Sequence, residues 1–148
     1  MLGISYLCIT KQLKIRIMAD VKAFIRKWNG RTLEDDGSYV SKEFHSFQVA
    51  FFNAMRKIAK SLDGEVVNPL YGHYDMSGFI KCSDKYIYFN YSNGCGRGGR
   101  NHVVLKNNGD WLAPMYCRTA KNEKDYRGGY NNHCYFEDCE KVIERLLK

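Results

Sequence analysis

A wide apolar stripe through residues 42–62 limits what this chain can fold into. The apolar side chains of this segment recur every three or four residues, which is the spacing of one helix face. They are Phe44, Phe47, Phe51, Phe52, Met55, Ile58, Ala59 and Leu62. Ser41 stands at the expected N-cap position, and Asp63-Gly64 supplies a stop. A helix with so broad an apolar face must pack against another layer.

Shorter helical patterns lie on both sides of this segment. Residues 20–28 begin with Asp20 as a cap and place Val21, Phe24 and Trp28 on one face. Residues 135–147 form a closing helix with Phe136, Cys139, Val142, Ile143, Leu146 and Leu147 turned inward. Both helices are therefore expected to cover the same core as the long one.

Strand patterns fill most of the chain between the second and third helices. The expected strands are 65–71, 74–82, 85–92, 101–106 and 111–119. Ser83-Asp84 predicts a tight hairpin, and the polar segment 120–133 is expected to be a loop. The result is an α+β domain. It has an antiparallel four- to five-stranded sheet, with the N-terminal helices and the C-terminal helix packed on one face.

Residues 1–17 differ from the rest, because apolar residues there largely alternate with others, as on a strand. Met18-Ala19-Asp20 reads like a natural start. The first seventeen residues are therefore expected to be a leader or an added edge strand, and residues 18–148 a single domain. The apolar stretch is too short and too interrupted for a membrane span, and it lacks the order of a signal peptide.

The aromatic strand that leads into a glycine- and arginine-rich loop, Tyr86 to Arg100, suggests a contact surface. Alternation puts Tyr86 and Tyr88 on one face, and Ile87, Phe89 and Tyr91 on the other. Arg97 and Arg100 add two cations in a segment whose glycines allow sharp turns. The loop has no phosphate-binding motif, because no Gly-Lys-Ser/Thr ends it and no helix pattern follows. A solvated hairpin loop is the alternative.

A second basic segment, 118–130, follows the last expected strand. Basic residues interleaved with tyrosines suit a nucleic acid or an acidic protein, although Glu123 and Asp125 weaken the local field. The two loops and the tyrosine face together give the expected partner-binding residues. These are Tyr86, Tyr88, Arg97, Arg100, Arg118, Lys121, Lys124 and Arg127. The net charge of +7 permits such partners, and the excess lies in residues 1–63.

Catalytic and metal motifs are missing from the sequence. There is no C-x-x-C pair, no pair of histidines at helical spacing and no deaminase motif, so no cofactor and no metal are expected. Six cysteines and four histidines leave a small Cys/His enzyme as an alternative. With no secretion signal, the cysteines are expected to be reduced.

Residues 72–80, 85–89 and 118–126 carry a resemblance to known proteins. These segments resemble short proteins carried on conjugative and phage-derived mobile elements of gut Firmicutes. The similarity covers roughly residues 20–148. Those proteins have a short hairpin where this chain has the longer insertion of residues 94–100. Because small proteins of mobile elements often inhibit host defence, the resemblance implies an anti-CRISPR-type inhibitor in the cytoplasm of a bacterial host cell.

The resulting hypothesis is a non-enzymatic binding protein that inhibits a host defence nuclease through its aromatic and basic surface. Its partner would be that nuclease or the nucleic acid the nuclease holds, and no membrane is involved. Inhibitors that mimic DNA are strongly acidic, whereas this chain is basic. A single-stranded nucleic-acid-binding accessory protein is the first alternative, and the small Cys/His enzyme is the second.

Overall fold

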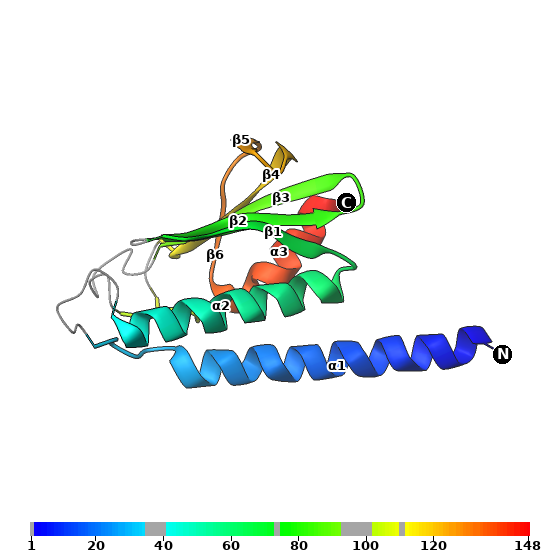
Figure 1. Cartoon of the computed structure of the whole chain (residues 1–148), viewed down its shortest axis with the longest axis horizontal. Coiled ribbons are helices and arrows are strands. Elements are labelled where there is room, and N and C mark those ends of the chain that lie inside the picture. Colours follow the sequence, from blue (N-terminus) through cyan, green and yellow to red (C-terminus); the bar gives the residue numbers. More distant parts are fainter. Residues whose placement is uncertain (1, 35–40, 73–74, 93–101, 110–111) are drawn as a thin grey trace.

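A computed structural model describes residues 2–34, 41–72, 75–92, 102–109 and 112–148 (Figure 1). Within these ranges the chain forms three α-helices, a short 3-10 helix and a six-stranded antiparallel sheet. The expected α+β class is confirmed. None of the helices in the described ranges combines the length and the apolar character needed to cross a membrane.

The elements follow one another as two helices, six strands and a closing helix. In chain order they are α1 (Leu2–Trp28), α2 (Lys42–Ser61), β1 (Glu65–Tyr71), β2 (Asp75–Cys82), β3 (Lys85–Ser92), β4 (Met115–Asn122), β5 (Asp125–Gly128), β6 (Asn132–Cys134), the 3-10 helix η1 (Phe136–Asp138) and α3 (Cys139–Leu147). The sheet order is β1-β2-β3-β4-β5, and β6 also pairs with β4. The Ser83-Asp84 turn joins β2 to β3 as expected, with Cys82 paired to Lys85.

The first helix corrects one expectation. The prediction of an edge strand in residues 1–17 was wrong, because α1 runs without a break from Leu2 through Met18 to Trp28. Ile17 and Val21 are buried four residues apart on the same face, so the helical period extends back across Met18. The expected helix 20–28 is therefore the last part of a longer one, and its N-terminal end projects beyond the other elements (Figure 1).

The fourth expected strand also differs from the structure. Residues 101–106 were expected to form a strand, but 102–106 make only an isolated bridge between His102 and Thr32. The side-chain oxygen of Asn29 accepts hydrogen bonds from the backbone of Leu105 (2.8 Å) and Lys106 (3.0 Å), so a side chain replaces the strand partner. The strand expected at 111–119 begins at Met115 instead.

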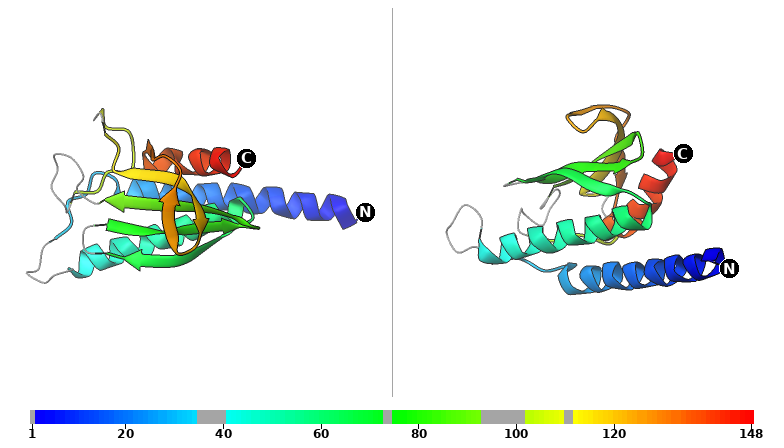
Figure 2. Two further views of the ribbon diagram at one scale, coloured as in Figure 1. Left: turned by 90° about the horizontal axis from the view of Figure 1, so that it is seen from above. Right: turned by 45° about the vertical axis from the view of Figure 1, so that its right-hand side comes forward.

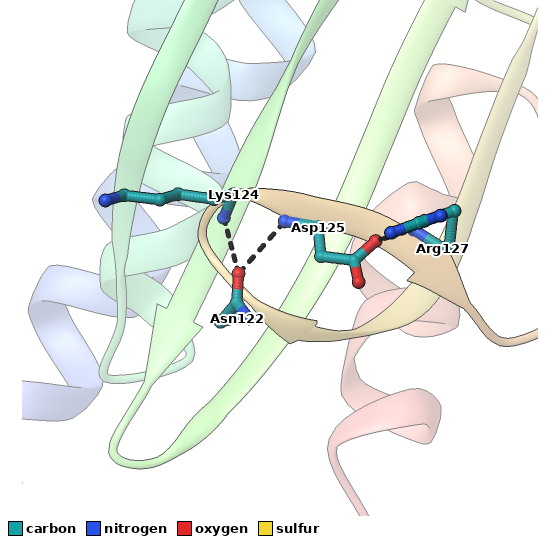
Figure 3. A network of polar contacts seen from close by, with 4 residues as sticks. All are labelled: Asn122, Lys124, Asp125 and Arg127. Carbon is teal, nitrogen blue, oxygen red and sulfur yellow. Dashed lines mark hydrogen bonds and ion pairs between the residues drawn. The ribbon is translucent and has the colours of Figure 1, made fainter.

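The segment 120–133 was expected to be a loop, and this was wrong because it contains β5 and β6. The side chain of Asn122 accepts hydrogen bonds from the backbone nitrogens of Lys124 (2.8 Å) and Asp125 (3.0 Å), which makes the turn between β4 and β5 (Figure 3). β5 pairs with the end of β4, and β6 pairs with its beginning. Residues 120–133 have little strand character of their own, and they form strands because they pair with the edge of β4.

The core lies between the helices and the inner face of the sheet. Ser41 caps α2 as expected, accepting a hydrogen bond from the backbone nitrogen of Phe44 (3.1 Å). The inner face of β3 carries Ile87, Phe89 and Tyr91, all fully buried, which confirms the predicted alternation. All three α-helices lie on this side, and the described residues place no helix on the opposite side (Figures 1 and 2). That opposite side is the outer face.

Candidate binding surface

The outer face of the sheet is lined with aromatic side chains brought together by strand register. Tyr88 on β3 pairs with Phe79 on β2 and with Arg118 on β4. Asn90, two residues further along β3, pairs with Tyr116. Because every second residue points to the same face, Tyr88, Tyr116 and Arg118 gather at one place.

Arg118 lies at the centre of this aromatic surface. Its guanidinium carbon is 5.5 Å from the ring centroid of Tyr88, 5.4 Å from that of Tyr116 and 5.6 Å from that of Tyr126. Arg118 Nε is buried and has no hydrogen-bond partner in the described part of the chain. We call Arg118 with Tyr88, Tyr116 and Tyr126 the tyrosine–arginine face. Contacts between a cation and rings hold the guanidinium in place without using its hydrogen-bonding capacity fully.

Ring contacts continue outward from this centre. The Tyr88 ring lies 5.4 Å from Tyr126 and 5.3 Å from Phe79, and the Tyr116 ring lies 5.6 Å from that of His133. Tyr126 is 53% exposed, whereas Phe79 is buried. Side chains that brace one another lose little freedom when a partner binds, so the surface is preorganised.

The β4–β5 hairpin curls over part of the outer face (Figure 2). At its tip, the carbonyl oxygen of Glu123 accepts a hydrogen bond from the side chain of Asn68 on β1 (2.7 Å). A cleft of about 510 Å³ lies against the hairpin, lined by Tyr86 and residues 122–127. The hairpin is thus tied to the far edge strand, and it leaves an open cleft beside the tyrosines.

Burial and the arginine act on the Tyr116 hydroxyl in opposite directions. Burial raises the pKa of Tyr116 above its ordinary value, while the hydrogen bond and positive charge of Arg118 lower that pKa. Loss of Arg118 should therefore raise the pKa of Tyr116 further. The difference between ultraviolet titrations of the wild-type protein and Arg118→Ala would measure this change.

The structure places the expected site residues in three groups. Tyr86, Tyr88 and Arg118 share the outer face, and Lys121, Lys124 and Arg127 belong to the β4–β5 hairpin. Arg127 forms an ion pair with Asp125 (3.0 Å), so part of the hairpin charge is neutralised locally (Figure 3). Arg97 and Arg100 lie outside the described residues.

Two side chains of the tyrosine–arginine face were not among the predicted site residues. These are Tyr116 and Tyr126, whose rings surround Arg118 together with that of Tyr88. Their contacts with Arg118 depend on which strands pair. The alternation of Tyr116 and Arg118 along β4 was a usable signal, since both point to the face that Tyr88 occupies.

Most of the positive charge lies on the helices and not on the outer face. The described residues from 10 to 61 hold eleven Lys and Arg, all exposed, against three Asp and Glu. Around the outer face the charges are more nearly balanced. There the cations Lys81, Arg118, Lys121, Lys124 and Arg127 accompany the acids Asp75, Glu123 and Asp125. The two sides of the molecule therefore differ in their chemistry.

Three cysteines gather on the inner side of the sheet, away from the tyrosines. Cys117, Cys134 and Cys139 are all buried free thiols. The hydrogen bond between the Cys117 and Cys134 thiols lowers the pKa of Cys134, whereas burial raises that of Cys139. His133 contacts Tyr116 on the outer face, so it points away from its neighbour Cys134.

Cys134 should be the first of these three thiols to react with iodoacetamide near pH 8. Its lowered pKa increases the thiolate fraction, and the thiolate is the nucleophile. Replacing Cys117 with alanine removes the hydrogen bond and should slow the alkylation of Cys134. Peptide mass spectrometry over time measures the order, and faster labelling of Cys139 would contradict it.

Comparisons with known proteins return no matching family model, no matching curated protein and no matching solved structure. What the protein does is therefore inferred from the two surfaces themselves. The outer face offers aromatic rings around a fixed arginine, and the helices offer exposed positive charge.

Proposed function

We propose that this protein is a non-enzymatic binding protein that inhibits a host defence nuclease, with a CRISPR effector as the leading case. The tyrosine–arginine face would be its contact surface. The observation that supports this most is the guanidinium of Arg118, held among three tyrosine rings on a sheet face that no described helix covers.

The composition of this face favours a protein partner. Tyrosine and arginine dominate the energetic centres of protein interfaces, whereas other charged residues are depleted there. Around the outer face the described cations exceed the acids by only two, five against three, and the rings at its centre are braced by one another. The resemblance to short proteins of mobile elements supplies the choice of a defence nuclease as the target.

Cleavage assays with purified, guide-loaded CRISPR effectors test this function. We expect a stoichiometric amount of this protein to stop target cleavage by at least one effector. Arg118→Ala should weaken this inhibition, and Tyr130→Ala is its matched control. Tyr130 is 93% exposed and shares no ring contact with the tyrosine–arginine face among those the structure describes. Full cleavage by every effector in the panel, together with no binding to any of them, would contradict the proposal.

A second candidate function, single-stranded nucleic-acid binding, is favoured by Tyr126. This ring is 53% exposed, and Lys124 and Arg127 line the same cleft. An exposed ring between cations can stack a base while the cations contact phosphates. Fluorescence anisotropy with a labelled single strand tests it. Binding that Tyr126→Ala weakens would support this function, and binding that is insensitive to both Tyr126 and salt would exclude it.

A further inference from the structure

The outward side of the helix pair carries a concentrated positive charge that the tyrosine–arginine face does not use. Five exposed cations lie along the length of α1, and the only acidic residue of this helix is Asp20. They are Lys11, Arg16, Lys22, Arg26 and Lys27. Together with Lys57 and Lys60 of α2, they form what we call the helix face. Lys14 is left out because it lines a cleft with Glu140 and Glu144.

The cations of α1 are held in a fixed array. At 100° per residue, Lys11, Lys22 and Arg26 fall on one side of the helix, and Arg16 and Lys27 on the adjoining side. The opposite side of α1 is anchored in the core by Ile17, Val21, Phe24 and Trp28. From Lys11 to Lys27 the array is about 24 Å long at 1.5 Å per residue. It therefore presents a rigid row of charges, not a single anion site.

Acidic side chains close to this array are already engaged. Asp20 forms an ion pair with Lys57 of α2 (3.0 Å), which also ties the two helices together. Glu43 pairs with Arg31 (2.8 Å). Glu137 lines a groove with Lys22 and Arg26, and its carboxylate accepts a hydrogen bond from the backbone nitrogen of Asn107 (3.0 Å). In the described part of the chain Lys11, Arg16 and Lys27 form no ion pair, and Lys22 and Arg26 share their groove with a single carboxylate, that of Glu137.

The chemistry of the helix face fits a duplex better than a single strand or a membrane. Single strands are bound by stacking on exposed rings, but Trp28 is buried, and Lys27 and Arg31 lie over its ring. A membrane-surface helix inserts its apolar side, whereas between Leu13 and Trp28 the apolar side of α1 packs against the core. A row of cations about 24 Å long instead matches the closely spaced phosphates of a double helix.

We propose that the helix face binds the phosphate backbone of double-stranded nucleic acid, without reading its sequence. This surface lies on the opposite side of the molecule from the tyrosine–arginine face (Figure 2). The inference goes beyond the proposed function and does not depend on it. A target that holds a guide or target duplex would be contacted by both sides of the chain.

Anisotropy titrations with labelled 20-base-pair DNA and RNA duplexes at 50 and 200 mM salt test the proposal. The wild-type protein should bind, and its affinity should fall with salt by a logarithmic slope of about 0.9 for each phosphate contacted. In the triple variant Lys22→Gln, Arg26→Gln, Lys27→Gln that slope should drop by up to about 2.7, with affinity at 50 mM at least about tenfold weaker. Asp20→Asn should tighten binding, because it removes the only acid of α1.

The matched control removes the same charge from the other side of the molecule, as Lys81→Gln, Lys121→Gln, Lys124→Gln. It should change duplex affinity by no more than about threefold. Binding of either duplex with this pattern supports the proposal, and circular dichroism confirms that each variant is folded. No duplex binding at 50 mM, or an equal loss of duplex affinity in both triple variants, would overturn it. Arg118→Ala should leave duplex binding unchanged, so failure here and failure of the proposed function are separate results.

Discussion

Replacing Arg118 with alanine should weaken binding to the target nuclease by about 100-fold, which corresponds to about 2.7 kcal/mol. The guanidinium contacts three tyrosine rings and has a buried Nε with no described hydrogen-bond partner. Alanine removes the cation that the three rings surround, so the face loses both a charged contact and the support of its rings. Titration of the inhibited effector with each variant measures the change.

Two further variants test whether the Arg118 guanidinium itself, and not positive charge alone, makes the contact. Arg118→Lys keeps the charge but not the planar stacking, so it should recover only a small part of the binding. Lys121→Ala removes one positive charge from an exposed position on the same strand and should be nearly neutral. Unchanged inhibition by Arg118→Ala, at an unchanged melting temperature, would show that the contact surface lies elsewhere.

Phe51→Ala should destabilise the fold by about 3–5 kcal/mol, the largest stability change we expect. Phe51 is fully buried on α2, and its ring contacts link both sides of the core. The partners are Phe47, Phe52, Phe89, Tyr91 and Phe136, at centroid distances of 5.3 to 6.3 Å. Removing the ring leaves a cavity between α2, β3 and the C-terminal elements. Urea unfolding followed by circular dichroism measures the loss.

Val49→Ala is the matched control for this change, since Val49 lies two residues earlier on the same helix and is 40% exposed. It should alter the unfolding free energy by no more than about 0.5 kcal/mol. A domain of this size is stable by only about 5–15 kcal/mol, so Phe51→Ala would remove a large share. A loss below about 1 kcal/mol would mean that the aromatic core is not packed as described.

Local patterns predicted the elements that carry their own periodicity. The stripe in residues 42–62 and the alternation in 85–92 each need no partner to be recognised, and α2 and β3 match them. The first residues of α1 were misread because alternating apolar residues also fit a longer helical stripe. β5 and β6 have weak strand character and exist because β4 offers them an edge.

The candidate surface was predictable only in part, for a related reason. Tyr86, Tyr88 and Arg118 were named from alternation and charge, and they share the outer face. The contribution of Tyr116 and Tyr126 depends on strand pairing between distant segments, which no local pattern reveals. The excess of positive charge in the first half was visible in the sequence. Its cations lie on one side of α1 only because residues expected to form a strand are part of that helix.

Photo-crosslinking at two positions tests the central claim, that the tyrosine–arginine face contacts the target protein. A photoreactive benzoylphenylalanine would replace Tyr126 in one variant and Lys60, on the helix face, in the other. In the complex with the inhibited nuclease, the Tyr126 variant should crosslink to the nuclease polypeptide and the Lys60 variant should not. Crosslinks to the polypeptide from the Lys60 position alone would contradict the account.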